Sequence, residues 1–277
     1  MKFEFLGVFL KIDSDNCNKK MALLNISMKL KENFDKAKKR LILLDYDGTL
    51  VEFVPRPEKA FPTEKVLSLL NRINNKPDTR LVVISGRGHL DLERFIGHLP
   101  IEIIAEHGAM IKLNGSWRNL FDNSDSWKKV VLPVLNRFTF ASPNSFVEEK
   151  QFSLVWHYRN VPDDVGFLQS RELIRILENS ITSLGLKLID GDKVVEIISN
   201  KIGKGSAIKN LINENKFDYI ISIGDDKTDE EMFQELSTNK KAETIKVGRG
   251  PTVAKHSLEN VKQVLLFLEH LMENNKN

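Results

Sequence analysis

Short apolar runs that end abruptly in small or charged residues recur along the chain and predict the strands of a parallel sheet. The runs are continuous rather than alternating, which is typical of strands buried on both faces. Five are expected to be strands: Leu41–Leu44, Leu81–Ile84, Ile101–Ile104, Tyr219–Ile223 and Thr244–Val247.

Between several of these runs, apolar residues recur every three to four positions and predict amphipathic helices. Such helices are expected around Val66–Ile73 and Ala207–Ile212. Residues 22–40 show the same period and predict a helix with a solvated basic end, Lys36 to Arg40. Alternating strands and helices predict an α/β fold with a doubly wound parallel sheet, in which ligands bind beyond the carboxyl ends of the strands.

The alternation is interrupted between about Ile111 and Ile198, which predicts an inserted α/β domain. Residues 152–157 alternate like a strand, residues 168–184 look helical, and residues 187–198 form a hairpin pattern that turns near Gly191 and Asp192. The expected divisions are an N-terminal extension and helix (1–35), the first part of the core (36–111), the insert (112–198), the second part of the core (199–272) and a flexible tail (273–277).

Composition fits an ordinary globular protein. A length of 277 residues corresponds to about two domains. The 41 basic and 38 acidic residues leave a formal charge of +3, too even to suggest wholesale nucleic-acid binding. Cys17 is the only cysteine, which excludes an internal disulfide and favours a reducing, cytoplasmic compartment. The apolar stretch Phe3–Leu10 is too short for a membrane span and contains Glu4, so neither a span nor an export signal is expected, and residues 1–20 receive no functional role.

Two acidic clusters follow predicted strands. Asp45 and Asp47 end one strand, and Asp225, Asp226 and Asp229 follow another. Each cluster alone could simply cap helices or end strands. Two carboxylates about 4 Å apart repel by roughly 4 kcal/mol at an effective dielectric constant near 20, so converging clusters would need a cation. Hard oxygen ligands favour Mg²⁺, which also binds phosphate oxygens, so a phosphate-bearing substrate is expected.

Three further residues could complete a phosphate site. Ser85 and Gly86 end a predicted strand, where a hydroxyl and backbone amides can hold phosphate oxygens. Lys204 precedes a predicted helix and could place an ammonium against phosphate and nucleophile. Alone, each feature is weak, and a lysine before a helix is commonly just exposed. Their order along the chain with the acidic clusters makes the pattern specific.

The segments LLDYDGTL, VVISGR, KIGKG and GDDKTDEEMF, in that order, resemble the four motifs of the haloacid dehalogenase superfamily of phosphotransferases. The resemblance implies that Asp45 attacks phosphorus to form an aspartyl-phosphate, and that Asp47 is the general acid and base. It also implies that Asp225 binds Mg²⁺ together with Asp45 and the backbone carbonyl of Asp47. Asp226 and Asp229 would orient the metal, its waters or Lys204.

Additional segments resemble trehalose-6-phosphate phosphatases over about Leu41 to Leu271. They are Pro57, Ala60 and Pro62 after DYDGTL, AEHGA, EEKQFSLVWHYR and VVEI. The resemblance implies Mg²⁺-dependent hydrolysis of trehalose 6-phosphate to trehalose and inorganic phosphate, with the insert as a cap. A sugar needs fixed carboxylate acceptors and cationic donors, and the expected cap contacts are Lys150 and Glu196, followed by Glu149 and Arg159. Solvated charges are the alternative interpretation of Glu149 and Lys150.

Glu106, His107 and Gly108 follow a core strand where the insert is expected to begin, and we expect them at the hinge or cleft. For His107 a structural role is favoured. One departure from the resemblance concerns Ile198 and Ser199, which stand where many relatives have a basic residue and proline, so the sugar specificity stays open. Alternatives are a phosphatase of another sugar phosphate (sucrose, glucosylglycerate or mannosylglycerate phosphate), a phosphomutase, and a non-catalytic sugar-phosphate-binding module. Neither a membrane nor a nucleic acid is expected as a partner, and the oligomeric state is open.

Overall fold

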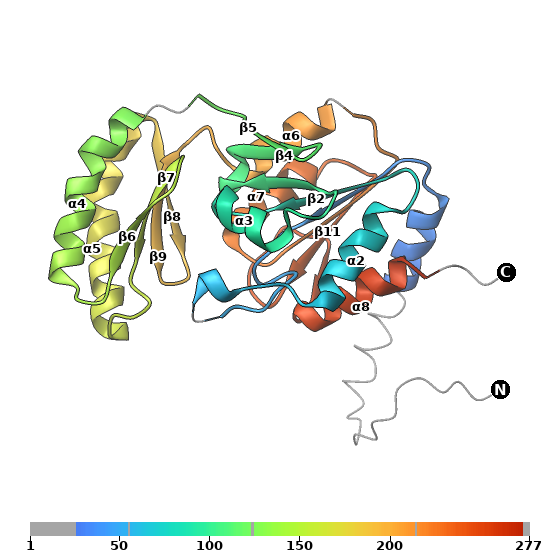
Figure 1. Cartoon of the computed structure of the whole chain (residues 1–277), viewed down its shortest axis with the longest axis horizontal. Helices are drawn as coiled ribbons and strands as arrows, with labels where there is room; N and C mark the ends of the chain where they lie inside the picture. Colours follow the sequence, from blue (N-terminus) through green and yellow to red (C-terminus); the bar gives the residue numbers. More distant parts are fainter. Residues whose placement is uncertain (1–25, 55, 123–124, 214, 274–277) are drawn as a thin grey trace, which may run out of the picture.

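The computed structural model describes residues 26–54, 56–122, 125–213 and 215–273. The main sheet contains eight strands in the order β12-β11-β10-β1-β2-β3-β4-β5 (Figure 1). Neighbouring strands from β12 to β3 are parallel, and β4 and β5 are antiparallel. The strands are β1 (Arg40–Leu44), β2 (Thr79–Ile84), β3 (Glu102–Ala105), β4 (Met110–Leu113), β5 (Ser116–Asn119), β10 (Tyr219–Gly224), β11 (Ala242–Val247) and β12 (His256–Leu258). All five predicted strands lie in the parallel part, which confirms the predicted fold class.

Helices cover both faces of this sheet because its central strands are apolar on both sides. Ile42 and Leu44 pack on one side, while Leu41 and Leu43 pack on the other. The first side is covered by a helix over residues 26–36 and by α2 (Glu64–Asn74), α3 (His89–Ile96) and α8 (Val261–Leu271). The second side is covered by α6 (Lys204–Asn213) and α7 (Lys227–Leu236). Each buried aliphatic side chain contributes about 1.5–3 kcal/mol to this core.

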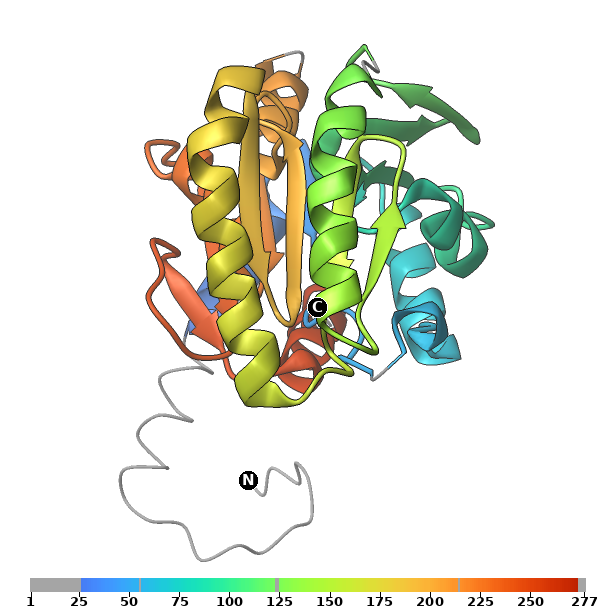
Figure 2. The same cartoon turned by 90° about the vertical axis from the view of Figure 1, so that its left-hand side faces the viewer.

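The insert has its own antiparallel sheet in the order β6-β7-β9-β8. Its elements are α4 (Lys128–Ala141), β6 (Phe146–Glu149), β7 (Ser153–His157), α5 (Asp163–Ile181), β8 (Leu186–Gly191) and β9 (Val194–Ser199). The two helices cover one face of this sheet, as Figure 2 shows, and the opposite face is turned toward the main sheet (Figure 1). Single 3₁₀ turns occur at Pro57–Lys59, Glu106–Gly108, Asp125–Trp127 and Thr182–Leu184.

Two predictions about boundaries were wrong. The insert was expected to begin at residue 112, but β4 and β5 pair with β3 and extend the main sheet to Asn119. The basic stretch before the first strand was expected to be a solvated helix end. Lys36, Lys38 and Lys39 are exposed as expected, but the described helix ends at residue 36, and Arg40 opens β1, where its partly buried guanidinium donates to the carbonyl oxygen of Phe34 at 2.6 Å. The predicted start of that helix and the stretch Phe3–Leu10 lie outside the described residues.

The chemistry-bearing residues gather at one edge of the main sheet. Asp45, Ser85, Glu106 and Asp225 each follow directly after a strand, and the four strands β10, β1, β2 and β3 are neighbours. Because β1 pairs with β10 in the register Leu44 to Ile223, the two acidic clusters emerge side by side. Within the described part of the chain, no helix is long and apolar enough to cross a membrane.

Candidate active site

Asp45, Asp229 and Lys204 form a buried network at the carboxyl edge of the sheet. The Lys204 ammonium donates to Asp45 Oδ1 at 2.6 Å and to Asp229 Oδ1 at 2.7 Å. Carboxylate oxygens of Asp45, Asp225 and Asp229 all lie within 4.8 Å of one another. The sequence therefore correctly predicted that the two acidic clusters converge, and that Lys204 meets the first of them.

The electrostatics of this network show an excess of negative charge. Burial, and then the Asp229 carboxylate, raise the pKa of Asp45 well above its ordinary value despite Lys204. The same two causes raise the pKa of Asp225 to about 7. Although burial opposes it, the carboxylates of Asp229 and Asp45 raise the pKa of Lys204. One ammonium does not balance three carboxylates, so the arrangement suits a further cation.

The turn after β1 brings the Asp225 side chain directly against Gly48. Gly48 has a φ of +71°, and a β-carbon at this position would lie 2.3 Å from Asp225 Oδ2. Only glycine allows both the left-handed backbone and this close approach. Gly48 in the first acidic motif therefore leaves the space that the Asp225 carboxylate of the second motif occupies.

Asp229 also shapes the backbone that carries Asp225. Its Oδ2 accepts hydrogen bonds from the backbone amides of Asp225 and Asp226, each at 2.9 Å. Asp226 itself caps α7, and its side chain accepts from the Lys227 amide at 2.7 Å. Asp226 is exposed, whereas Asp229 is fully buried. Asp229 is therefore part of the buried acidic cluster, whereas Asp226 caps the N-terminus of α7.

Asp47 is held by Arg87, a residue to which the sequence gave no role. The guanidinium donates to both carboxylate oxygens of Asp47 at 2.6 Å, and to the carbonyl oxygen of Pro57 at 2.8 Å. It also lies over the rings of Tyr46 and Phe95, 5.6 and 5.2 Å from their centroids. Arg87 directly follows Ser85 and Gly86 in the second motif, and that position was the only signal in the sequence.

Ser85 and Gly86 form a tight loop at the end of β2. Ser85 is buried, its Oγ accepts from the Arg87 amide at 3.2 Å, and its carbonyl oxygen accepts from the His107 amide at 3.0 Å. The His107 ring packs on Gly86, where a β-carbon would lie 2.4 Å from the ring. The Gly86 carbonyl oxygen accepts from the Lys150 ammonium at 2.9 Å. The loop is thus braced by the hinge and by the insert.

Two of the four predicted cap residues meet at this junction. The Glu196 carboxylate accepts from the Ser153 hydroxyl at 2.5 Å, lies 3.1 Å from His107 Nε2 and lies 3.3 Å from the Lys150 ammonium. Although burial opposes it, Lys150 and His107 lower the pKa of Glu196. Ser153 is a partner that the sequence analysis overlooked, because its position on the inner face of β7 follows only from the strand pairing.

The other two predicted cap residues have different neighbours. Glu149 is more than half exposed and lies 3.6 Å from the Lys128 ammonium. Arg159 pairs with Asp192 at 2.8 Å, at the turn between β8 and β9. The structure therefore brings together Lys150 and Glu196, whereas Glu149 is linked to Lys150 through Lys128, and Arg159 pairs with Asp192 away from this cluster.

The residues predicted at the hinge connect the main sheet with the insert. Glu106 and His107 both have a positive φ, at 48° and 57°. This unusual backbone turns the buried Glu106 carboxylate toward the insert, where it accepts from the Phe152 amide at 2.7 Å. Gly108 packs closely against the residue before α6. A β-carbon at Gly108 would lie 2.9 Å from the Gly203 carbonyl oxygen.

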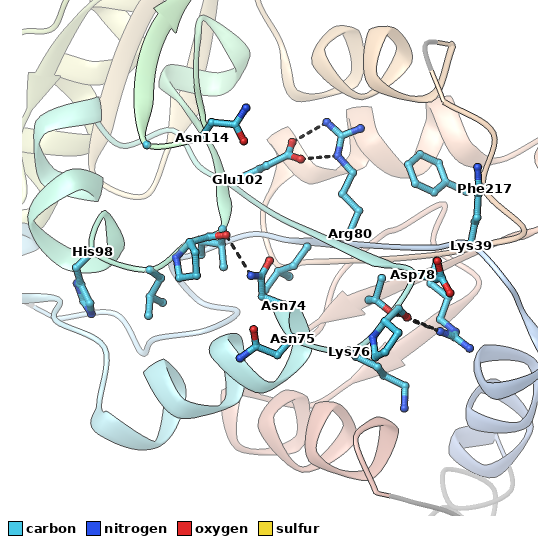
Figure 3. Close-up of a pocket in the computed structure, with 18 of the residues that line it drawn as sticks. Lys39, Asn74, Asn75, Lys76, Asp78, Arg80, His98, Glu102, Asn114 and Phe217 are labelled. Atoms are coloured by element: carbon cyan, nitrogen blue, oxygen red, sulfur yellow. Dashed lines mark hydrogen bonds and ion pairs between the residues drawn. The ribbon is translucent and has the colours of Figure 1, made fainter.

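A cavity of about 940 Å³ lies at the opposite edge of the main sheet. It is lined by the starts of β1, β2 and β3 and by the ends of α2 and α3, and it contains none of the predicted site residues. Its lining contains the cations Lys39, Arg40, Lys76 and Arg80. Arg80 is paired with Glu102 at 2.6 Å, and Asn74 donates to the Pro100 carbonyl oxygen (Figure 3). The acidic edge, rather than this cavity, holds the clustered carboxylates and ammonium suited to phosphate chemistry.

Comparison with known proteins places these motifs in a family. A family model described as trehalose-phosphatase matches residues 43–263. The chain is 41% identical over 244 residues to a bifunctional trehalose-6-phosphate synthase/phosphatase of Thermoproteus tenax, covering 88% of this chain and 33% of that protein. The chain spans about a third of the length of the curated relatives that it matches.

Solved structures agree with this assignment. The C-terminal domain of a trehalose-6-phosphate phosphatase from C. albicans superposes with a TM-score of 0.83 at 30% identity, covering 89% of this chain and 96% of that chain. A haloacid dehalogenase-like hydrolase from B. subtilis superposes with a TM-score of 0.57 at 16% identity, covering 83% of this chain and 99% of that chain. The second likeness, at 16% identity, concerns the fold alone, which is haloacid dehalogenase-like.

Proposed function

Because the chain belongs to the trehalose-phosphatase family, we propose that it hydrolyses trehalose 6-phosphate to trehalose and inorganic phosphate through an aspartyl-phosphate. The observation that carries the proposal is the buried network in which Lys204 bridges Asp45 and Asp229, within 4.8 Å of Asp225. In this network the proposed nucleophile lies beside one cation and beside carboxylates that would hold another, which supports the proposal. A cytoplasmic location stays a prediction from the single cysteine.

Asp45 is the nucleophile of the proposed reaction. A carboxylate oxygen forms a bond to phosphorus as the bond from phosphorus to the sugar oxygen breaks. The Lys204 ammonium, 2.6 Å from Asp45 Oδ1, lowers the repulsion between the carboxylate and the incoming phosphate dianion. In the second half of the reaction, water attacks phosphorus, and the carboxylate of Asp45 is released with inorganic phosphate.

Asp47 handles the protons. As an acid it donates a proton to the departing sugar oxygen, and as a carboxylate it then accepts a proton from the attacking water. Both of its oxygens now accept from Arg87 at 2.6 Å. Donation to the sugar therefore requires one oxygen to leave the guanidinium and turn toward Asp45.

Mg²⁺ is the proposed cofactor, and the residues present fit it. The site offers three carboxylates of hard oxygen donors within 4.8 Å of one another, and no described histidine or cysteine belongs to the group. Asp45, Asp225 and the backbone carbonyl of Asp47 would hold the ion, with Asp229 beside them. When bound, Mg²⁺ would neutralise charge on the phosphate and on the carboxylates.

The phosphate and the sugar would be bound by different layers. The Ser85 hydroxyl, the Gly86 amide and Lys204 lie at the sheet edge and suit the phosphate oxygens. Lys150 contacts the Gly86 carbonyl oxygen and Glu196 lies 3.1 Å from His107 Nε2, so both stand where the insert meets this edge, and both suit sugar hydroxyls. We propose that residues after Asn119 and up to Ser199 act as a cap that closes over the substrate, with Glu106, His107 and Gly108 facing it from the main sheet at the cleft.

A substrate panel tests the proposal. Phosphate release is measured with and without Mg²⁺ from equal concentrations of trehalose 6-phosphate and of the phosphates of sucrose, glucosylglycerate and mannosylglycerate. Trehalose 6-phosphate should be turned over fastest, and only when Mg²⁺ is present. A tenfold preference for another sugar would refute the specificity, an isomeric sugar phosphate as product would indicate a phosphomutase, and binding without turnover would indicate a binding module.

A further inference from the structure

Lys128 is a buried charge in a row of apolar residues. It begins the buried stripe of α4 that continues with Val131, Leu135 and Phe138, and it is only 5% exposed. Such a position ordinarily holds an aliphatic side chain, because burying an ammonium removes its hydration. The residue therefore needs an explanation in terms of what its ammonium binds.

The Lys128 ammonium points to the turn that joins β6 and β7. It donates to the carbonyl oxygen of Lys150 at 2.5 Å and to that of Gln151 at 3.1 Å. A carboxylate oxygen of Glu149 lies 3.6 Å away. An aliphatic side chain could fill the same volume in α4, but it would leave both carbonyls without this donor. The charge thus fastens the helix to the turn.

The same turn is fastened to the main sheet from the other side. The Phe152 amide donates to the Glu106 carboxylate at 2.7 Å, and the Lys150 ammonium donates to the Gly86 carbonyl oxygen at 2.9 Å. A helix of the insert, the hinge and the phosphate loop therefore all converge on four consecutive residues, 149–152. One of these, Lys150, is a proposed contact of the sugar.

We propose that Lys128 is a positioning residue that sets where the Lys150 ammonium stands, and that it thereby controls selectivity for the sugar part of the substrate. The inference rests on the proposed function. Lys128 acts through the carbonyls of the turn, whereas the phosphate would be held by Ser85, Gly86 and Lys204 from the main sheet. Loss of Lys128 should therefore weaken recognition of the sugar much more than recognition of phosphate, because, among the described residues, the Lys150–Gly86 bond is the one contact that links the turn to the phosphate loop, which His107 also holds.

The variant Lys128→Met tests this, because methionine keeps much of the apolar volume and removes the donor. The matched control is Lys129→Met, which makes the same change of charge at the next residue of α4, where the side chain is exposed. The measurements are KM and kcat for trehalose 6-phosphate with Mg²⁺, and the Kd of inorganic phosphate by calorimetry. Lys128→Met should raise KM by about tenfold or more and leave the phosphate Kd within about twofold, while Lys129→Met should match the wild type.

A KM unchanged in Lys128→Met would overturn the inference, and so would a parallel rise of KM and of the phosphate Kd, which indicates general disruption. Lys128→Gln keeps amide donors but is too short to reach both carbonyls, so it should give a smaller rise of KM in the same direction. If Lys128→Met does not fold, the KM and the phosphate Kd of Lys128→Gln decide whether the inference holds. The wild type is measured first. If it does not turn over trehalose 6-phosphate, the proposed function fails, and the same variants are compared on the sugar phosphate that the wild type hydrolyses fastest.

Discussion

At the scale of single residues, the main feature of the site is a group of charged side chains that are buried from water. Asp45 is only 4% exposed and Asp229 is not exposed at all, so water does little to screen their repulsion. Lys204 is nearly as buried and contacts both of them. Removing Lys204 would leave these buried carboxylates without their ammonium, which is far more costly than losing a surface ion pair, whereas removing one carboxylate would leave Lys204 still paired with the other.

The variant Asp45→Asn should lower kcat by roughly 10³-fold or more, because an amide cannot replace the anionic nucleophile. Substrate binding should persist, since the Ser85 and Lys204 contacts remain. Phosphate release under saturating trehalose 6-phosphate measures the first effect, and calorimetry measures the second. Asp164→Asn, at the exposed start of α5, is the control and should keep the wild-type rate. A near-native kcat for Asp45→Asn would contradict the assignment.

Glu196→Gln should destabilise the protein in a way that depends on pH. The lowered pKa of Glu196 means that the folded carboxylate holds its proton less tightly than the unfolded one. Its contribution to stability is therefore complete above the ordinary glutamate pKa of about 4.3 and is lost as the pH falls toward the lowered value. The variant should unfold with about 3 kcal/mol less free energy at pH 6, because Lys150 stays buried without its partner.

Thermal or urea unfolding from pH 6 to pH 3 checks this. The difference in the free energy of unfolding between the wild type and Glu196→Gln should decrease steadily below about pH 4.3. Glu178→Gln, an exposed substitution on α5, should differ from the wild type by less than about 0.5 kcal/mol. A gap that stays constant over the whole range would show that Glu196 does not act through its charge.

Residue-level prediction from the sequence succeeded where a side chain follows directly after a strand. Asp45 and Asp225 had to lie near each other once β1 and β10 were neighbours. Arg87, Lys128 and Ser153 were not assigned, because their partners are distant in sequence and are fixed by packing. Lys128 carried a usable signal as a charge at the apolar spacing of Val131 and Leu135, and Arg87 carried one through its position in the second motif.

At the scale of elements, the central strands were predictable because they are apolar on both faces. The pair β4 and β5 was not predicted, since β5 is largely exposed and reads as polar. A signal was present at Asn114 and Gly115, whose φ values of 51° and 80° form the two-residue turn of this hairpin. The missed hairpin is why the insert was expected to begin too early.

The turn after β1 gives a test at this scale. Gly48→Ala should lose about 1–2 kcal/mol of stability from the left-handed backbone and should also displace the Asp225 carboxylate. Phosphatase activity should therefore fall by about tenfold or more. Gly115→Ala is the matched control, because Gly115 has a φ of +80° but nothing within 4 Å of a β-carbon.

Both variants should show a similar loss of stability in thermal unfolding, and only Gly48→Ala should lose activity. Equal activities in the two variants would mean that the close approach of Gly48 to Asp225 is irrelevant to catalysis. The comparison separates backbone strain, which the two glycines share, from the contact, which they do not.

At the scale of the whole molecule, Mg²⁺ should stabilise the fold. An ion that binds the native state at 100 times its Kd adds about 2.7 kcal/mol to the free energy of unfolding. The thermal midpoint of the wild type should rise with Mg²⁺ and return after chelation, because the ion would offset the burial and the Asp229 charge that raise the pKa of Asp225. In Asp225→Asn, Mg²⁺ should no longer raise the thermal midpoint, while in Asp164→Asn it should raise the midpoint as in the wild type. An equal rise in all three proteins would place the ion elsewhere.

The chain leaves the insert at Ser199, the last residue of β9, and reaches Lys204 after only four intervening residues. Five residue steps of fully extended backbone span at most about 18 Å. The insert, which is proposed to bind the sugar, and Lys204, which contacts the proposed nucleophile Asp45, are therefore joined by one short segment of chain. If the insert moves as proposed, this short segment would carry the movement directly to the start of α6, where Lys204 stands against Asp45 and Asp229.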